Sequence, residues 1–179
     1  MGRPKLAAAR AKAGPRPNQT FVAIDFETAD YGSDSACAVG LIRVEGGKIV
    51  RKRHHFIRPP RPDFKFTYIH GISWEDVREK PTFAELWPDI EQDLRGAEFL
   101  AAHNSRFDEG VLKACCAAAG LEAPATPFLC TVRLARETWK LYPTKLPDVC
   151  RFLGLSLNHH EALSDAEACA RIVLAAIKA

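Results

Sequence analysis

The chain predicts an α/β fold in which a mixed five-stranded sheet is flanked by helices. An early run of three apolar strand patterns is followed by a second part in which helical patterns alternate with short strands. Strands joined by a tight turn pair antiparallel, whereas strands joined through a helix pair parallel, so the sheet is expected to be mixed. With 179 residues and 47% hydrophobic residues, the chain can form one domain with a sizeable core.

The first three strands are expected to form a meander. Residues 21–27 and 36–44 carry apolar strand patterns, and the glycine-rich segment 45–48 predicts a hairpin turn into a third strand over 49–57. A proline-rich stretch then ends the meander, because proline cannot donate to a sheet ladder. Residues 64–73 are expected to be a loop.

The rest of the chain alternates between helix and strand. Helices are expected over residues 74–79, 81–95, 106–119, 132–139, 146–153 and 165–178, and strands over 98–103 and 128–131. Gly120 is expected to stop the helix over 106–119. Ser164 and Glu167 have the spacing of a capping box, which predicts that the last helix begins at Asp165.

The N-terminal segment differs in composition from the rest of the chain. Residues 1–19 predict a flexible basic tail, and residues 20–179 the folded domain, because the first twenty residues carry five basic side chains, no acid and three prolines. The whole chain carries a net charge of +3, which leaves −2 for the remainder. The tail is either a solvated terminus or an aid to encounters with nucleic acid.

No membrane partner is expected, because the sequence has neither the apolar stretch of a signal peptide nor a run long enough to cross a bilayer. The six cysteines lie in apolar or helical contexts, without a CxxC pair or a histidine at zinc-ligand spacing. They are expected to be buried, reduced thiols, which favours a cytoplasmic location.

Two acids lie in an otherwise apolar strand. Asp25 and Glu27 share one face because side chains alternate along a strand, whereas Phe26 points the other way into packing. Two acids at this spacing, taken by themselves, are common at solvated strand ends. In an apolar, central strand, however, unpaired carboxylates are costly, so the pair indicates a cation site.

Two further acids open helices. Asp108 lies in a first turn, where the helix dipole favours a carboxylate, although its spacing from Ser105 also fits an ordinary cap. Asp165 has no local role if Ser164 and Glu167 supply the cap. His160 and His159 precede it on a loop that can bend either imidazole toward the same cleft. The chemistry of the two residues does not decide which of them is the active one.

Four carboxylates and one imidazole are what a two-metal phosphodiesterase needs. Hard cations such as Mg²⁺ and Mn²⁺ prefer oxygen ligands, and two of them can stabilise both the attacking and the leaving oxygen of a phosphate. The imidazole can then act as the general base for the attacking water.

Three ordered motifs, DFET, HNSRFD and HHEALSDA, resemble the DEDDh (DnaQ-like) 3′–5′ exonucleases, the group that includes the proofreading epsilon subunit of bacterial DNA polymerase III. The resemblance extends over residues 20–179 and includes RPP at 58–60, IHGIS at 69–73 and the segment 81–87. It implies a ribonuclease H-like fold. It also implies two divalent ions, Mg²⁺ or Mn²⁺, whose ligands would be Asp25, Glu27, Asp108 and Asp165. The histidine-x4-aspartate spacing of the family implies a general base at His160.

The resemblance further implies hydrolysis from a free 3′ end to nucleoside 5′-monophosphates, with Phe26, Thr28 and Ile72 contacting the terminal nucleotide. Where many epsilon-type domains have DTETTG, this chain has DFETAD, which changes sugar and base contacts but no metal ligand. Single-stranded DNA is the expected substrate, and short RNA is the alternative, since a slightly acidic domain fits a grip on a short terminal segment.

A non-catalytic nucleic-acid-binding module is the less favoured interpretation, because such a module would not need all five groups. The chain stops after the last helix without the extension by which the epsilon subunit joins its polymerase, so a free-standing nuclease is expected. The oligomeric state stays open.

Overall fold

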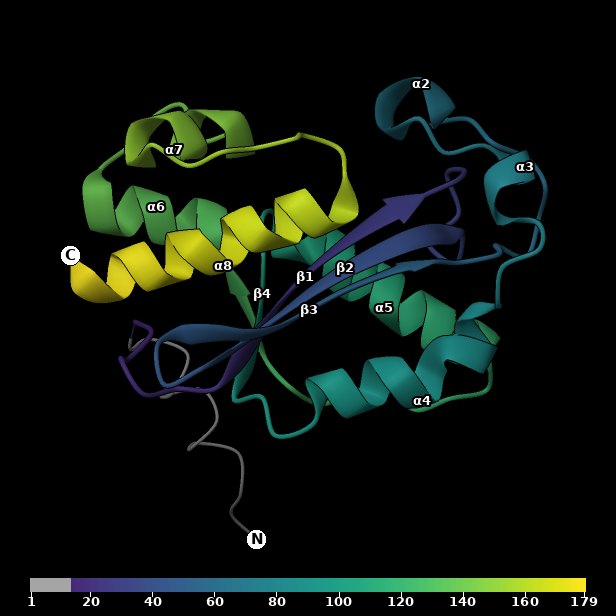
Figure 1. Ribbon diagram of the computed structural model, residues 1–179, viewed down its shortest axis with the longest axis horizontal. Coiled ribbons are helices and arrows are strands. Elements are labelled where there is room, and N and C mark those ends of the chain that lie inside the picture. Colours follow the sequence, from purple (N-terminus) through teal and green to yellow (C-terminus); the bar gives the residue numbers. More distant parts are fainter. Residues whose placement is uncertain (1–13) are drawn as a thin grey trace, which may run out of the picture.

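The computed structural model describes residues 14–179 and contains the predicted mixed sheet, with strands in the order β3-β2-β1-β4-β5 (Figure 1). The strands are β1 (Phe21–Thr28), β2 (Ala36–Glu45), β3 (Lys48–Phe56), β4 (Phe99–Ala102) and β5 (Phe128–Cys130). The first three pair antiparallel as a meander, whereas β4 pairs parallel with β1 and β5 parallel with β4. The central strand is therefore β1, which carries two of the predicted ligands.

Helices cover both faces of the sheet. They are α2 (Thr67–His70), α3 (Trp74–Val77), α4 (Phe83–Leu94), α5 (Ser105–Ala118), α6 (Thr131–Trp139), α7 (Leu146–Leu153) and α8 (Ala162–Lys178). Helices α4 and α5 contribute to one apolar core, and α6, α7 and α8 contribute to the core on the opposite face (Figure 1).

Alternation along β1 decides which way its acids point. Val22, Ile24 and Phe26 belong to the core beneath α4 and α5, while Phe21 and Ala23 belong to the core beneath α8. Asp25 and Glu27 continue the second set, so they face the side on which α8 lies.

Gly40 allows α8 to begin close to the sheet. This glycine pairs with Asp25 across the β1–β2 ladder, and a side chain there would collide with the backbone of Ala162 and Leu163. The absence of a Cβ at this position therefore brings the first turn of α8, which contains Asp165, next to the acids of β1.

The predicted start of α8 was wrong by three residues. The helix begins at Ala162 with Glu161 at the N-cap position, and Ser164 does not form a capping box with Glu167. The Ser164 hydroxyl instead accepts the backbone N–H of Asn158 at 2.8 Å, and Glu167 pairs with Lys52 at 2.6 Å. Both candidate capping side chains are thus engaged by other segments.

Two other local predictions also need correction. Helix α5 begins at Ser105 after Asn104, a residue with φ of 63°, so Ser105 is not its cap. The segment predicted as a loop contains the one-turn helix α2, which ends at Gly71 in the left-handed conformation. A single turn is too short to show apolar periodicity, which is why the sequence pattern did not indicate it.

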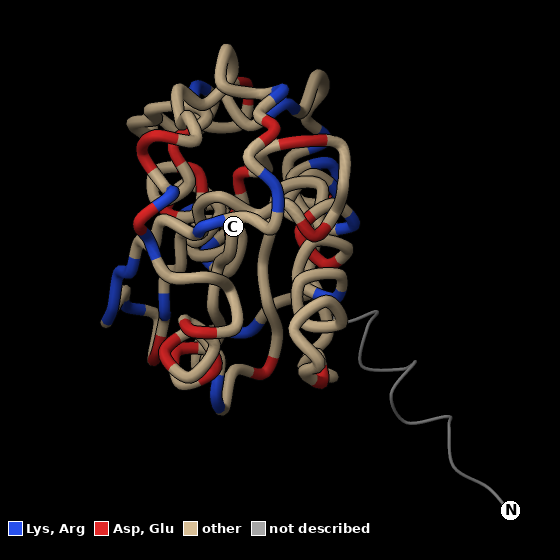
Figure 2. Tube along the Cα trace, turned by 90° about the vertical axis from the view of Figure 1, so that its right-hand side faces the viewer, with Lys and Arg blue, Asp and Glu red and all other residues tan. Residues whose placement is uncertain are grey.

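The predicted tail lies mostly outside the described residues, since residues 1–13 are not described. At the end of the predicted tail, which was expected to extend to residue 19, the Gln19 side chain donates to Glu98 at 3.1 Å. All six cysteines are free thiols. Between residues 14 and 179, no helix combines the length and the apolar character needed to span a membrane. Along the Cα trace in Figure 2, acidic and basic residues are interspersed.

Candidate active site

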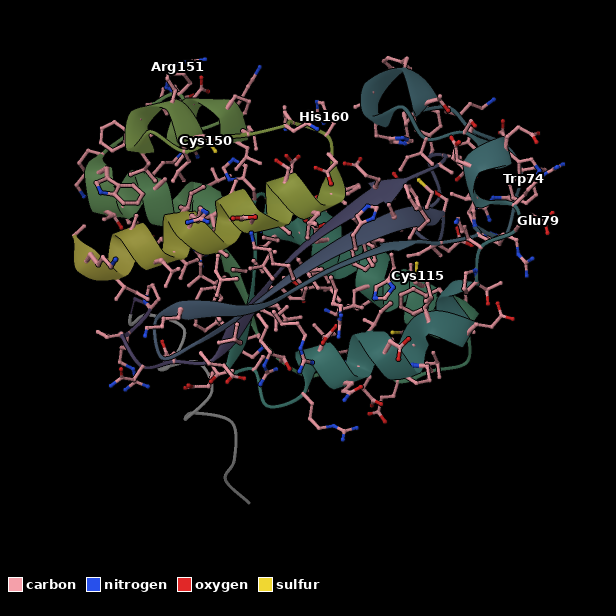
Figure 3. All side chains as sticks on the ribbon, viewed as in Figure 1. Trp74, Glu79, Cys115, Cys150, Arg151 and His160 are labelled. Carbon is pink, nitrogen blue, oxygen red and sulfur yellow. The ribbon has the colours of Figure 1, made fainter. Side chains whose placement is uncertain are left out.

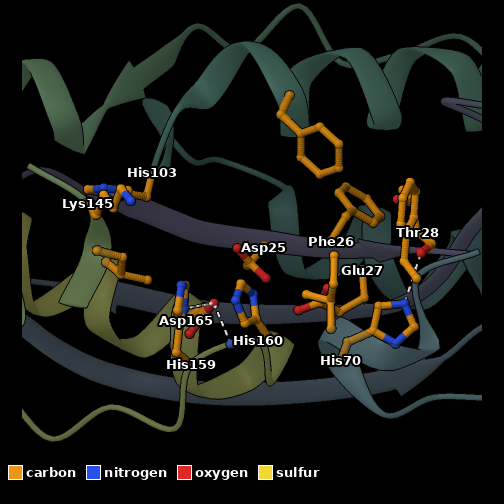
Figure 4. Close-up of a pocket in the computed structure, with 14 residues that line it drawn as sticks. Asp25, Phe26, Glu27, Thr28, His70, His103, Lys145, His159, His160 and Asp165 are labelled. Atoms are coloured by element: carbon orange, nitrogen blue, oxygen red, sulfur yellow. Dashed lines mark hydrogen bonds and ion pairs between the residues drawn. The ribbon is translucent and has the colours of Figure 1, made fainter. Parts of the chain in front are cut away.

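A cavity of about 450 Å³ lies where the end of β1 meets the start of α8. Its lining includes Asp25, Glu27, His160 and Asp165, four of the five residues predicted to be catalytic. The close-up in Figure 4 shows Asp25, His160 and Asp165 near its middle. The fifth, Asp108, is buried behind the lining with 1% of its surface exposed.

Three carboxylates converge from two elements. Asp25 and Glu27 of β1 and Asp165 of α8 each offer an oxygen, and these oxygens lie within 4.8 Å of one another. No lysine or arginine of residues 14–179 forms an ion pair with any of the three carboxylates. In addition, the Oδ1 atom of Asp165 is buried without a hydrogen-bond partner among these residues. A buried carboxylate oxygen without a donor fits a cation ligand, and an all-oxygen donor set fits Mg²⁺ or Mn²⁺.

Burial and mutual repulsion shift the pKa of these acids upward. The pKa of Asp25 is raised well above its usual value, first by burial and then by Asp108 and Asp165. The same causes raise the pKa of Glu27 to about 8. Burial also raises the pKa of Asp165. The protein therefore supplies too little positive charge for all these groups to be ionised together at neutral pH.

Asp108 connects α5 to the central strand. Its Oδ1 atom accepts the backbone N–H of Phe26 at 2.8 Å, a contact between residues far apart in the sequence. Burial raises the pKa of Asp108 to about 8, although the Phe26 N–H acts in the opposite direction. This hydrogen bond, rather than a helix cap, orients the carboxylate beside Asp25.

The two histidines have different environments on the loop before α8 (Figure 4), where Figure 3 also labels His160. His159 Nδ1 lies 3.0 Å from Asp165 Oδ2, and the backbone N–H of His160 donates to the same oxygen at 3.1 Å. The rings stack with their centroids 3.7 Å apart, and His160 has φ of 67°. Among the described residues the His160 ring makes no hydrogen bond, and burial followed by the neighbouring His159 lowers its pKa. The neutral form that can accept a proton is thereby favoured.

Only two of the three residues predicted to contact the terminal nucleotide lie at the cavity. Phe26 and Thr28 line the cavity, whereas Ile72 does not. The Ile72 N–H donates to His70 Nδ1 at 3.0 Å, and Ile69, one turn earlier, lines the cavity instead. His70 in turn lies 2.9 Å from the Thr28 carbonyl through Nε2, which fixes α2 against the end of β1.

Several cavity residues were not predicted from the sequence. They are Phe66, Ile69, His70, His103, Phe107, Lys145 and Leu146. His103 and Phe107 belong to the HNSRFD motif, and Ile69 and His70 belong to the quoted IHGIS segment, so these motifs partly indicated the cavity lining. Lys145 has no such signal, because its position depends on the turn that precedes α7.

Comparison with known proteins gives a consistent picture. Residues 22–173 match the RNase T family, described as exonuclease. A PolC-type DNA polymerase III of Thermotoga maritima is 34% identical over 160 residues, covering 87% of this chain and 12% of the relative. Exodeoxyribonuclease 10 of Escherichia coli is 32% identical over 160 residues, covering 84% of this chain and 66% of the relative.

A solved structure shares the fold over nearly the whole chain. Exonuclease X in complex with 5′-overhanging duplex DNA superposes with a TM-score of 0.72 at 26% identity, covering 88% of this chain and 91% of that chain. The match confirms the predicted ribonuclease H-like arrangement of sheet and helices.

Proposed function

The chain belongs to the DEDDh (DnaQ-like) 3′–5′ exonuclease family, and we propose that it is a two-metal enzyme that releases nucleoside 5′-monophosphates from single-stranded DNA. One observation carries the proposal: Asp25, Glu27 and Asp165 converge around a buried, unpartnered carboxylate oxygen, and no lysine or arginine among residues 14–179 pairs with them. A purely structural cluster of acids would be expected to pair with lysine or arginine.

The metal ligands in this proposal are Asp25, Glu27, Asp108 and Asp165. Bound ions would supply the positive charge that stabilises both the attacking and the leaving oxygens of the phosphodiester. They would also offset the burial that raises the pKa values of the four acids, and the repulsion that adds to it at Asp25, Glu27 and Asp108.

The histidines take different roles. His160, whose ring lines the cavity without a hydrogen bond to any of the described residues, removes the proton of the attacking water. His159 holds Asp165 in place through the 3.0 Å contact between Nδ1 and Oδ2, which makes it a positioning residue. This division supports His160 over His159 as the general base.

The apolar lining favours an unpaired 3′ end. Phe66, Ile69 and Phe107 line the cavity, and Phe107 is 47% exposed, so a terminal base has apolar surface on which to stack. Phe26 and Thr28 would contact the same nucleotide. A DNA substrate is supported by the E. coli exodeoxyribonuclease and by the DNA-bound exonuclease X, and short RNA is the second candidate because the same chemistry serves both sugars. The free cysteines support the proposed cytoplasmic location.

Parallel digestion of matched DNA and RNA oligomers, labelled at the 5′ end, tests this function. With Mg²⁺ or Mn²⁺ the DNA should shorten progressively and release mononucleotides, and EDTA should stop the reaction. A phosphate on the 3′ hydroxyl should slow it, and a closed single-stranded circle should stay intact. Rapid cutting of the circle, or undiminished hydrolysis after chelation, would overturn the proposal, and faster digestion of the RNA would reassign the substrate.

A further inference from the structure

The two ends of the cavity differ in chemistry. Thr28 and His70 lie at one end, and His103 and Lys145 lie at the other, with Asp25 and Asp165 between them (Figure 4). Phe66 and Ile69 belong to the same short helix segment as His70 and also line the cavity. Lys145 is the only lysine or arginine among the described residues that line the cavity. Within the described part of the chain, this acid-lined cavity thus has one permanently basic side chain, at one end.

The backbone that carries Lys145 is held from both sides. The preceding residue, Thr144, is buried at 5% exposure, and its carbonyl oxygen lies 2.9 Å from His103 Nε2. Because a carbonyl only accepts, Nε2 donates this bond, while the Thr144 hydroxyl accepts from Arg136 at 2.8 Å. On the other side, the Lys145 N–H donates to Asp148 Oδ2 at 3.0 Å.

The ammonium group itself has no such partner. Lys145 is exposed, and no carboxylate of residues 14–179 lies within ion-pair distance of its Nζ atom. Most other cations near the sheet are paired, as Lys52 is with Glu167 and Arg51 with Asp93. A fixed backbone that presents an unpaired ammonium to an acid-lined cavity fits a role in binding an anion of the substrate.

We propose that Lys145 binds the phosphate immediately 5′ of the scissile phosphate, so that the strand leaves the cavity past His103 and Lys145. This inference rests on the proposed exonuclease function. The terminal nucleoside carries no phosphate other than the scissile one, so its base fits the apolar end, which has no cation. The rest of the strand is a polyanion, and the cationic end accommodates it.

The test compares substrates that do and do not contain that second phosphate. The first is a DNA oligomer, the second is the same oligomer with an uncharged methylphosphonate at the second linkage from its 3′ end, and the third is thymidine 5′-(4-nitrophenyl phosphate), which has one phosphodiester. Lys145→Ala and Lys145→Arg are measured with Mg²⁺ in single-turnover and steady-state experiments. Lys113→Ala is the matched control, because Lys113 is exposed on α5, outside the cavity, and pairs with Glu109.

Lys145→Ala should lower kcat/KM on the unmodified oligomer by about tenfold, mainly through KM, and Lys145→Arg should restore most of it. On the methylphosphonate oligomer, wild type and Lys145→Ala should be cleaved at equal rates. On the single phosphodiester the two should also be equal. The dependence of log kcat/KM on log salt concentration should become shallower by roughly 0.7 for Lys145→Ala, and Lys113→Ala should behave as wild type.

Other results would overturn the assignment. Equal losses on the oligomer and on the single phosphodiester would place Lys145 at the scissile phosphate or in a structural role. Additive losses from Lys145→Ala and the methylphosphonate would show that another group binds the second phosphate. A wild-type protein that cleaves no substrate with metal would instead contradict the proposed function, so the two failures can be told apart.

Discussion

Two groups of carboxylates lie close together in the sequence, and only one of them has its own cation. In the cavity group, Asp25 and Glu27 have no basic partner among residues 14–179, and burial with repulsion from neighbouring acids raises their pKa values. A few residues later, Asp30 and Asp34 both pair with Arg61, at 2.9 Å from its Nε and 2.7 Å from its Nη2 respectively. Hydrogen bonds from Arg61 lower the pKa of both aspartates.

The difference separates acids that stabilise the protein from acids that need an external cation. The Arg61 group joins the loop after β1 to the segment after β3, and each of its two carboxylates is paired with the guanidinium group of Arg61. The cavity group has an excess of negative charge, because no lysine or arginine among the described residues pairs with its acids. Asp30 belongs to the altered DFETAD motif, yet it pairs with Arg61 and does not line the cavity. Substitutions in the two groups should therefore have opposite consequences.

The largest effect is expected from Asp25→Ala. Removing this ligand should lower kcat by about 10³-fold or more, because the charge stabilisation of the reacting phosphate is lost. The fold should persist, since one of several crowded acids has been removed. The measurement is oligomer hydrolysis at saturating Mg²⁺, together with the melting temperature in EDTA. Asp34→Ala is the matched control and should keep its activity. An Asp25→Ala protein that unfolds while its folded fraction stays active would make Asp25 structural.

The second largest effect should come from His160→Ala, which removes the proposed general base. The rate should fall by roughly 10²–10⁴-fold, the usual contribution of general acid–base catalysis. His159→Ala should have a smaller effect and should mainly weaken metal affinity, because its ring holds Asp165 rather than the water. Rates at saturating metal and substrate give the ranking. The opposite ranking would move the base to His159.

Much of the fold and part of the site could be predicted from sequence pattern. The five strands, the mixed topology and the shared face of Asp25 and Glu27 were predictable because side-chain alternation is local. The start of α8 was not, because the long-range approach permitted by Gly40 and the bond from Asn158 to Ser164 override the capping signal. Nor could the sequence show that Asp108 accepts the Phe26 N–H, or that Thr144 fixes Lys145, since both depend on contacts between distant segments.

Metal should reverse a pH-dependent loss of stability. In the metal-free protein the folded pKa values of Glu27 and Asp108 are about 8, above those of the unfolded chain. Their contribution to stability is therefore fully present below about pH 4 and is lost as the pH rises through about 8. Melting temperatures in EDTA should fall from pH 6 to pH 9, and saturating Mg²⁺ should raise them most at the high end. A Mg²⁺ effect that shrinks with rising pH would contradict the unmatched charge of the cavity.

The smallest effect should come from the paired acids. Arg61→Met should lower the free energy of unfolding by about 1 kcal/mol, because Arg61 is 42% exposed and solvent screens the pair. That loss corresponds to about 3 °C in melting temperature.

The pKa values of Asp30 and Asp34 are lowered in the folded state, so their contribution to stability is present above the unfolded pKa and is lost as the pH falls through the folded value. Wild type and Arg61→Met should therefore differ at pH 7 and converge as the pH falls below about 4. Activity at saturating Mg²⁺ should change little. A loss of activity comparable to that of Asp25→Ala, in a folded Arg61→Met protein, would show that the two groups of carboxylates act as one site.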